Sequence, residues 1–338
     1  MRTVPAGSLA RLMEDALLRR GLPQEHVGWV VDGLLEASLR GIDTHGIRLF
    51  PTYLAELDGG RSKARPELRW SGGHAARLLD AGHALGLVAG RAACAEAVRL
   101  ARGFGVGAVA VRNSNHFGAA SVHTLEMARQ GALGLSFSNS DALVAPYNGV
   151  RPLFGTNPLS LAVRGLGEDL FCADFATSQV SYSRVKHHRD QDLPLEPGWA
   201  VTGDGGDAAG GGEVAALKPL GGHKGHCLGM MVEILCALLT GMPLDHELSH
   251  LYTPPFDEPR RVAHLFLAID VAAFREPGEF REDLSRLMGI VRTQPAAGAE
   301  RVIVPGDLES ASAADRRVHG IPMAEEEWDR FERAALSA

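Results

Sequence analysis

The sequence predicts an α/β protein that lacks the doubly wound dinucleotide-binding fold. Short apolar segments that suit strands alternate with longer segments whose apolar residues recur at helical spacing. One glycine-rich run, Gly103-Phe-Gly-Val-Gly107, superficially matches a dinucleotide fingerprint, but it precedes a strand. The fingerprint must follow a strand so that the pyrophosphate meets a helix N-terminus. The sequence also has no GxxxxGK[ST] phosphate loop. Any dinucleotide would therefore be bound by a different architecture.

The composition is that of an ordinary globular protein with a modest negative charge. The 338 residues are 45% hydrophobic and 22% charged, which is enough for a large core. The net charge of −7 argues against a nucleic-acid or membrane-surface binder, because both require basic patches. The N-terminus lacks a signal-peptide pattern, and the longest apolar run, Met230 to Leu239, is too short for a bilayer. We therefore expect a cytoplasmic protein.

The predicted elements follow from periodicity and from the glycines and prolines that interrupt it. Two amphipathic helices open the chain, with apolar stripes over residues 9–17 and 27–35. Further helices are predicted over 87–102, 119–130, 225–240, 280–291 and 325–335, strands over 77–80, 106–111, 133–137, 170–174, 264–270 and 301–304, and a long surface loop over 191–212.

The candidate for proton transfer is His116, in the run Asn113-Ser-Asn-His-Phe-Gly118. This polar run lies where a predicted strand passes into a predicted helix, a place where loops carry chemistry. The unperturbed pKa of an imidazole suits general acid–base catalysis near neutral pH. The alternative is a loop histidine that only hydrogen-bonds to backbone, and the spacing alone leaves both open.

A second polar segment offers a histidine and an arginine close together. Asp43-Thr-His-Gly46 brings His45, and Arg48 follows three residues later, on the same face if a helical turn begins there. A guanidinium binds a carboxylate in a bidentate manner, so a proton donor beside Arg48 suits a 2-oxo or 2-hydroxy acid. The alternative for Arg48 is a surface salt bridge at a helix end.

Three further segments could contact a cofactor. Lys224 stands between glycines at a predicted helix start, where lysine and free N–H groups favour phosphate. Ser138, Asn139 and Ser140 follow a strand, and Asp174 ends another, where its carboxylate could accept bonds from a ribose or from a backbone turn. For each segment a solvated loop or a plain turn is the alternative.

We predict no metal site. The four cysteines have no CxxC spacing and each lies in an apolar segment, as expected of buried thiols in a reducing cytosol. His223 and His226 lack a motif such as HExxH. The Gly203-Asp-Gly-Gly-Asp207 run lacks the alternating acidic ligands of a calcium loop.

Six ordered motifs together carry a family resemblance that covers nearly the whole chain. The sequence resembles the malate/L-lactate dehydrogenase family that is distinct from the Rossmann-type enzymes. Its members include ureidoglycolate, sulfolactate and diketogulonate oxidoreductases and the reductase of cyclic imino acids such as piperideine-2-carboxylate. The motifs are Asp43-Thr-His-Gly46 with Arg48, Ser114-Asn-His-Phe-Gly118, Gly155-Thr-Asn-Pro158, Asp174-Phe-Ala-Thr-Ser178, Gly222-His-Lys-Gly225 and Val304-Pro-Gly306.

The resemblance implies a fold and an assembly. The fold would be the family's own α/β type, with a mixed, largely antiparallel sheet and a discontinuous helical domain. On this basis residues 1–72 and 305–338 would form the helical domain, with substrate contacts and dimer surface, and residues 73–304 the NAD(P)-binding domain. The enzyme would be a homodimer whose active site lies near the subunit interface, with NAD or NADP as cofactor.

The resemblance also implies roles for individual residues. His116 matches the family's proton acceptor or donor, and His45 a histidine with an acid role in some members. Arg48 matches the contact to the substrate carboxylate, and we place Thr44 and Tyr53 beside it. The residues that match or flank cofactor contacts are Ser138, Asn139, Ser140, Asp174, Phe175, Ala176, His223, Lys224, Pro305, Gly306 and Asp307.

The sequence departs from the family pattern at a few positions, so several functions stay open. Ser183 and Arg184 stand where a Gly-Lys pair is usual, and His223 and His226 stand where tyrosines are frequent. We expect hydride transfer between nicotinamide and C2 of a small carboxylate-bearing substrate. The alternatives are reduction of a cyclic imino acid, a metal-dependent hydrolase built on the many histidines, and a catalytically silent member of the family.

Overall fold

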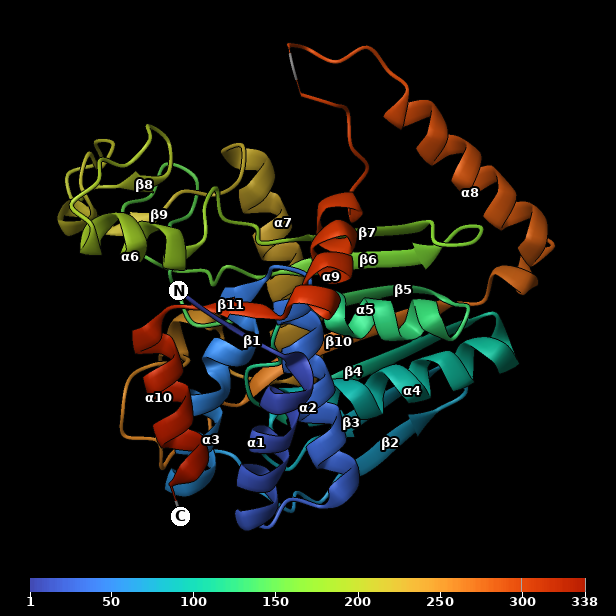
Figure 1. The fold of residues 1–338 in the computed structure, drawn as a ribbon, viewed down its shortest axis with the longest axis horizontal. Coiled ribbons are helices and arrows are strands. Elements are labelled where there is room, and N and C mark those ends of the chain that lie inside the picture. The colour runs from blue at the N-terminus through green and yellow to red at the C-terminus, as the bar shows by residue number, and fades with distance from the viewer. Residues whose placement is uncertain (299, 338) are drawn as a thin grey trace.

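The centre of the protein is a mixed seven-stranded sheet. The computed structural model describes residues 1–298 and 300–337. The strand order is β2-β3-β4-β10-β5-β6-β7, and among these described strands the β3–β4 pair is parallel and the other pairs are antiparallel (Figure 1). The bounds are β2 (Arg69–Gly73), β3 (Ala76–Asp80), β4 (Val106–Ser114), β5 (Leu133–Ser138), β6 (Leu159–Arg164), β7 (Leu170–Phe175) and β10 (Val262–Ile269). The predicted mixed, largely antiparallel sheet is confirmed.

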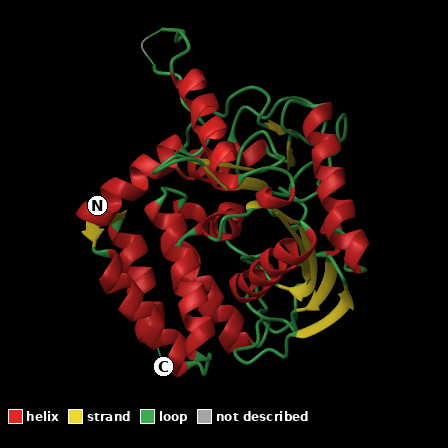
Figure 2. Ribbon diagram, turned by 90° about the vertical axis from the view of Figure 1, so that its right-hand side faces the viewer, coloured by secondary structure: helices red, strands yellow, loops and turns green. Residues whose placement is uncertain are grey.

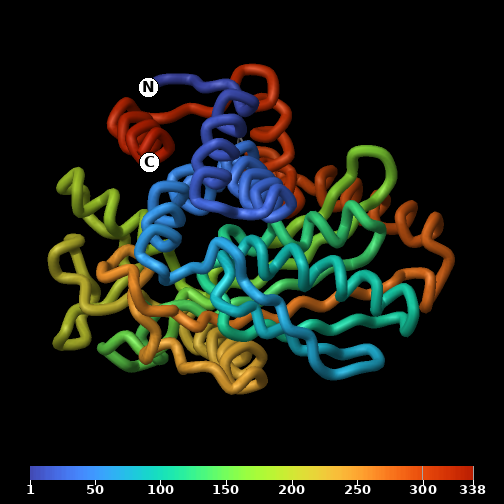
Figure 3. The backbone as a smooth tube through the Cα atoms, turned by 90° about the horizontal axis from the view of Figure 1, so that it is seen from below, coloured from blue at the N-terminus to red at the C-terminus, as the bar shows by residue number. Residues whose placement is uncertain are grey.

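Helices cover both faces of this sheet. Alternate residues of β10 face opposite sides, as the period of a strand requires. Phe266 belongs to the core under α4 (Gly86–Phe104), and Leu265 packs with Val232 and Cys236. Those two lie on α7 (His223–Glu233) and on the π-helical turn η4 (Ile234–Leu238) that continues it. Figure 3 shows α7 across the sheet from α4 and from α5 (Ala120–Arg129).

Segments from the two ends of the chain pack together. The short strand β1 (Arg2–Val4) pairs with β11 (Ile321–Met323). Helices α1 (Ala6–Arg19), α2 (Gln24–Leu39) and α3 (Phe50–Gly59) gather with α9 (Asp307–His319) and α10 (Glu325–Leu336). Figure 2 shows these helices on the left, together with the N-terminal strand, and the strands of the central sheet toward the right. The predicted apolar stripe over residues 9–17 is buried here.

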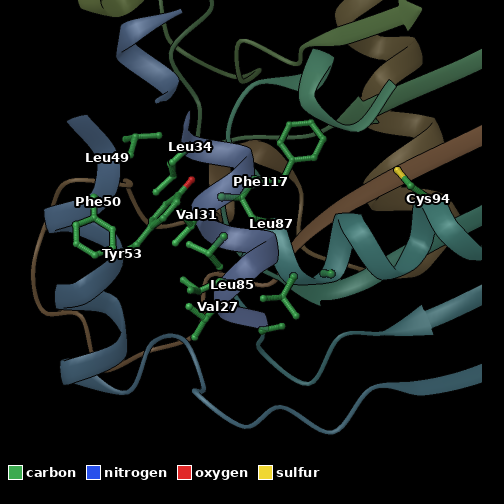
Figure 4. Close-up of a cluster of buried hydrophobic side chains, with 14 of the residues drawn as sticks. Val27, Val31, Leu34, Leu49, Phe50, Tyr53, Leu85, Leu87, Cys94 and Phe117 are labelled. Carbon is green, nitrogen blue, oxygen red and sulfur yellow. The ribbon is translucent and has the colours of Figure 1, made fainter. Parts of the chain in front are cut away.

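The core under these helices extends to the loop that carries His116. Residues 47–49 and 43–45 form short 3-10 turns, η2 (Ile47–Leu49) and η1 (Asp43–His45), between α2 and α3. Their apolar neighbours pack against the start of α4 and against Phe117 (Figure 4). The buried side chains that join the two regions include Val27, Val31, Leu34, Leu49, Phe50, Tyr53, Leu85, Leu87 and Phe117.

The remaining elements form a small unit and a projecting helix. Helix α6 (Tyr182–Asp190) and the two-residue strands β8 (Ala200–Val201) and β9 (Ala216–Leu217) enclose a second core around Trp199. Helix α8 (Pro277–Arg292) projects from the body in Figure 1. The short turns are η3 (Gly211–Glu213), η5 (Asp245–Glu247) and η6 (Val271–Ala273). Among the described residues no helix is both long and apolar enough to span a bilayer.

Some predicted elements differ from the structure. The strand over 301–304 is wrong, because this segment pairs with no strand; only the next residue, Pro305, accepts a bond from the N–H of Cys172, at 3.0 Å. The 191–212 segment is mostly loop but contains β8. Strands β1, β2, β6, β9 and β11 and helices α3, α6 and α9 were not predicted. Most of these segments are short or lack a strong apolar period, but Leu159–Arg164 alternates as a strand does, and that signal was missed.

Candidate active site

The loop after β4 is fixed by its own polar side chains. Asn113 adopts a left-handed backbone (φ 52°), which asparagine tolerates, and its amide donates to both carboxylate oxygens of Asp80 at 3.0 Å. Asn115 is fully buried and donates to the carbonyl of Ala84, also at 3.0 Å. Gly118 has φ 75°, in the left-handed region that favours glycine. His116 is therefore held in one place.

His116 meets the residues of the first polar segment. The hydroxyl of Tyr53, on α3, lies 2.8 Å from His116 Nδ1, and the Gly118 N–H donates to the same atom at 3.3 Å. The ring of His45 stacks on that of His116 with centroids 5.6 Å apart, and Thr44 Oγ1 is 3.0 Å from His45 Nδ1. Within the described residues His116 Nε2 has no partner, so this nitrogen is available to a ligand.

The surroundings keep both imidazoles neutral. Burial, together with the neighbouring His45, places the pKa of His116 well below its usual value, and burial also lowers the pKa of His45. The same burial raises the pKa of the Tyr53 phenol. At pH 7 the pocket thus contains a neutral histidine that can accept a proton, bonded to a neutral phenol.

The pocket beside His116 contains a guanidinium that the sequence analysis missed. Arg260 lines it together with His45, His116 and Ser140. Its side chain is 1% exposed; Nε donates to the Ser249 carbonyl at 2.9 Å and Nη2 pairs with Asp141. Residues 252–261 match no motif and have no periodicity, so nothing but its charge distinguishes Arg260 in the sequence.

Arg48, by contrast, is directed to the helical layer. Its Nε forms an ion pair with Glu327 of α10 at 3.1 Å, and its side chain is 36% exposed. Arg48 does not line the pocket that contains His116, although His45, three residues earlier, does. The structure therefore brings together His45, Tyr53 and His116, and leaves Arg48 beside them in a salt bridge.

The predicted Ser138–Ser140 segment divides into an inner and an outer part. Asn139 is internal, with its Oδ1 accepting from Ala263 N at 2.8 Å, and Ser138 is buried. Ser140 is half-buried in the pocket, and its hydroxyl accepts from Thr156 N at 3.0 Å. A side chain at Gly155 would collide with Ser140, so glycine is required in this turn.

The Asp174 carboxylate has a structural partner. Its Oδ2 accepts from Ser121 N at 2.8 Å, which places a carboxyl group at the N-terminus of α5. Burial raises the pKa of Asp174. Phe175 is exposed, and Ala176 leads to Thr177, whose N–H and hydroxyl both donate to the Thr156 carbonyl, at 2.8 and 3.0 Å.

The glycine turn before α7 joins the same region. Leu220 N donates to the Thr177 carbonyl at 2.9 Å, so one series of backbone hydrogen bonds connects Thr156, Thr177 and Leu220. Gly221 and Gly222 follow, and both have a positive φ. Helix α7 then begins without a side-chain cap. Lys224 is exposed in its first turn, and His223 meets the exposed Tyr147 edge to face at 6.1 Å.

The last predicted cofactor turn lies along β7. The Pro305 carbonyl accepts from Cys172 N, and Gly306 (φ 101°) packs against Leu170 and Cys172 too closely for a side chain. Asp307 is engaged within the protein: Arg292 donates to both of its oxygens, at 2.7 and 3.1 Å. Its carboxylate therefore fixes α8 to α9.

These segments have the donors that an anionic dinucleotide requires. An uncapped helix N-terminus with a lysine offers N–H groups and positive charge to phosphate. Gly155 and Gly306 are buried and allow their turns to pack closely, and Gly222 has a positive φ just before α7. A larger cavity of about 330 Å³ lies apart from His116, between α2, α4 and α5, but its Arg91–Glu126 and Arg129–Glu36 pairs already neutralise one another. No set of three or more metal-binding side chains is found among residues 1–298 and 300–337.

Comparison with known proteins agrees with this geometry. The family model described as malate/L-lactate dehydrogenase matches residues 4–332. The chain belongs to this family. It is an NAD(P)-dependent dehydrogenase or reductase, with NAD or NADP as its cofactor.

Its relatives have several substrates in their names. The chain is 31% identical to a malate dehydrogenase of Pyrococcus abyssi (98% of this chain, 94% of the relative). It is 30% identical to the NAD⁺-dependent ureidoglycolate dehydrogenase of Escherichia coli O157:H7 (94% and 92%) and 34% identical to the NADP⁺-dependent (2R)-3-sulfolactate dehydrogenase of Chromohalobacter salexigens (89% of each).

Solved structures confirm the fold. A malate dehydrogenase from Entamoeba histolytica superimposes with a TM-score of 0.93 at 27% identity, covering 99% of this chain and 97% of the other. A Δ1-piperideine-2-carboxylate reductase from Pseudomonas syringae gives 0.86 at 29% identity, covering 99% and 100%. The prediction of the family-specific, non-Rossmann fold is thereby confirmed.

Proposed function

We propose that this protein transfers a hydride between NAD(P) and C2 of a small 2-oxo or 2-hydroxy acid. The observation that carries the proposal is that His116, His45, Arg260 and Ser140 line one and the same pocket. Malate, sulfolactate and ureidoglycolate, named for the relatives, are all small acids with a hydroxyl beside a carboxylate. The cofactor, when bound, supplies or accepts the hydride.

The protein's own residues bind the acid and manage the proton. The Arg260 guanidinium attracts the substrate carboxylate, and His45 and Thr44 orient the oxygen at C2. In oxidation, the reacting tautomer of neutral His116 carries its own proton on Nδ1, and its Nε2 takes the hydroxyl proton; in that tautomer the Gly118 N–H, 3.3 Å away, no longer donates to Nδ1. The charged ring then donates from Nδ1 to the Tyr53 hydroxyl, 2.8 Å away, which holds its orientation. Positioning both reacting groups on one substrate is the main source of acceleration.

A second candidate is reduction of a cyclic imino acid. The low pKa of His116 favours it, because an imine takes its proton from water more readily than a ketone does and needs no charged histidine. The likeness to the piperideine-2-carboxylate reductase is consistent with this. The family model describes a dehydrogenase, which argues against the metal-dependent hydrolase alternative.

The test is an NAD(P)H absorbance assay with matched substrates. Purified enzyme is given pyruvate-like 2-oxo acids or cyclic imines, each with NADH and with NADPH. Turnover of the oxo acids, and of the hydroxy acids in reverse, supports the main proposal; turnover of cyclic imines alone supports the second. Turnover of neither class with either cofactor contradicts both.

We also propose the assembly and domain division that the resemblance implies. Helix α7 and η4 expose a row of large apolar side chains, Met230, Met231, Ile234, Leu238 and Leu239, next to the Lys224 turn. Contact between two copies there would place the site near the interface of a cytoplasmic homodimer. The pairing of β1 with β11 supports a helical domain built from both chain ends, as in the division into 1–72 with 305–338 and 73–304. Strand β2 (Arg69–Gly73) belongs to the central sheet, so the first bound moves to before Arg69. Analytical ultracentrifugation tests the dimer, and a monomer contradicts it.

A further inference from the structure

A completely buried histidine lies under the active-site loop with no part in the reaction described above. His264 is on β10, the strand between β4 and β5, and it is 0% exposed. Its Nε2 is 2.8 Å from the Ser114 hydroxyl at the end of β4. Its Nδ1 is 2.9 Å from the Ser138 hydroxyl at the end of β5. The ring thus bridges both neighbouring strands.

The bonding partners define the direction of each hydrogen bond. The Ser138 hydroxyl donates to the Asn139 carbonyl at 2.8 Å, so it accepts from His264 Nδ1–H. A neutral imidazole with a proton on Nδ1 has an acceptor at Nε2, and the Ser114 hydroxyl donates to it at 2.8 Å rather than to the Asn115 carbonyl, which is 3.4 Å away. Both ring nitrogens and both hydroxyls are satisfied in this arrangement. Burial lowers the pKa of His264 to about 3, so the ring remains neutral at physiological pH.

The position of the ring connects it to both halves of the site. Ser114 is two residues before His116, and Ser138 is two residues before Ser140. Phe117, the neighbour of His116, stacks flat on His264 with centroids 4.6 Å apart and planes within 4°. Phe266 lies on another side of the ring, with centroids 6.0 Å apart. An apolar residue in place of His264 would leave the buried Ser114 and Ser138 hydroxyls without this partner.

We propose that His264 is a positioning residue that fixes the proton-transfer residue His116 relative to the cofactor-side residue Ser140. The bond to Ser114 and the ring stack on Phe117 hold the His116 loop. The bond to Ser138 holds the end of β5, from which Ser140 enters the pocket. This inference rests on the proposed function, because it assigns the two strand ends to the proton and to the cofactor respectively.

The two bonds can be removed separately. Asparagine places a donor near the position of Nδ1 and so keeps the Ser138 bond, whereas glutamine places an acceptor near Nε2 and keeps the Ser114 bond. His264→Asn should therefore lower kcat, by roughly tenfold to a hundredfold if the loop shifts by about an ångström, with little change in NAD(P)H Kd. His264→Gln should instead raise the Kd for NAD(P)H several-fold, with a smaller change in kcat.

The partner serines provide independent variants. Ser114→Ala should reproduce the His264→Asn result, and Ser138→Ala the His264→Gln result. The control is Val109→Ala, because Val109 is fully buried on β4 opposite Phe266 and touches neither bond. It weakens the same sheet, so it shows what a general loss of stability does to kcat and Kd.

The experiment measures kcat, NAD(P)H Kd by fluorescence, and Tm for all five variants. The proposal is supported if loss of the Ser114 bond mainly lowers kcat and loss of the Ser138 bond mainly raises the Kd for NAD(P)H. Parallel losses that follow Tm and match Val109→Ala overturn it, even when the wild-type enzyme is active and His116→Ala abolishes turnover. If the wild type neither binds NAD(P)H nor turns over any acid, the proposed function itself fails, and the role of His264 fails with it.

Discussion

The two ends of the proposed site are built in different ways. The closed end consists of His45, Tyr53, His116 and Arg260, whose side chains are held by specific contacts. Tyr53 is hydrogen-bonded to His116, His45 stacks on His116, and Arg260 pairs with Asp141. The open end, formed by Phe175, His223, Lys224 and Pro305, consists of exposed residues on turns. The difference fits the demands of each task. Proton transfer needs groups fixed before the substrate arrives, whereas a cofactor must enter and leave.

The largest expected effect lies at the closed end. His116→Ala should reduce kcat by roughly two to four powers of ten, because the general acid–base contribution is lost. The Kd for NAD(P)H should change little, since the open end is intact. The control is His319→Ala, which removes an exposed histidine of α9. Steady-state kinetics and cofactor fluorescence give both numbers, and unchanged turnover would remove His116 from the mechanism.

The two arginines separate the closed end from the helical layer. Arg260→Lys keeps the charge beside Asp141 but loses the bidentate geometry, so the KM for the acid should rise by roughly tenfold to a hundredfold. Arg48→Lys should raise KM by less, because Arg48 pairs with Glu327 and does not line the pocket. Substrate titration with Tm as a stability check decides between them. A larger rise in KM for Arg48→Lys than for Arg260→Lys would mean that Arg48 is the residue that contacts the substrate carboxylate.

The sequence could predict some features of the fold and of the candidate site but not others. Most helices and strands with clear periodicity were predicted to within a few residues. The motifs selected both His116 and His45 as candidates, and the structure stacks their rings although 71 positions separate them. Proximity of that kind was implied by a family resemblance rather than by periodicity, because local spacing says nothing about contacts between distant segments.

The missed residues share a physical reason. Arg260 lies in a segment without periodicity, and its place in the pocket depends on tertiary contacts to Asp141 and Ser249. For Asp174 a ribose and a backbone group were both possible partners, and the structure gives it Ser121 N. Asp307, which the resemblance implies as a cofactor contact, pairs with Arg292. A sequence shows which side chains can bond but not which partner they find first.

Two buried carboxyl groups, those of Asp245 and Glu233, support the Gly155–Asn157 turn, which lies between the closed end and the open end of the site. Asp245 Oδ2 accepts from Gly155 N at 2.8 Å, and Asp245 N donates to Glu233 at 2.9 Å. Burial and the neighbouring Asp245 raise the pKa of Glu233 from 4.5 to about 9. Between these values the folded protein keeps a proton that the unfolded chain has lost, so stability falls as pH rises.

Glu233→Gln should remove that decline, because the amide imitates the protonated acid. Relative to wild type, the free energy of unfolding should rise at pH 8 by on the order of 1 to 3 kcal/mol and stay nearly the same at pH 5. Urea unfolding at the two pH values measures it, with Glu282→Gln on the exposed face of α8 as the control. Equal shifts at both pH values would mean that Glu233 is not protonated in the folded state.

The smallest effect belongs to the open end. Lys224 is exposed, and its attraction for a phosphate is weakened by solvent, so Lys224→Ala should raise the NAD(P)H Kd by only about two- to fivefold at low salt. Salt screens exposed charges, so the difference should shrink as ionic strength rises. The control is Lys63→Ala, an exposed lysine outside these turns. Fluorescence titrations across a salt series measure both. A large, salt-independent loss would mean that the Lys224 ammonium becomes buried when the cofactor binds, and that the open end closes around its ligand.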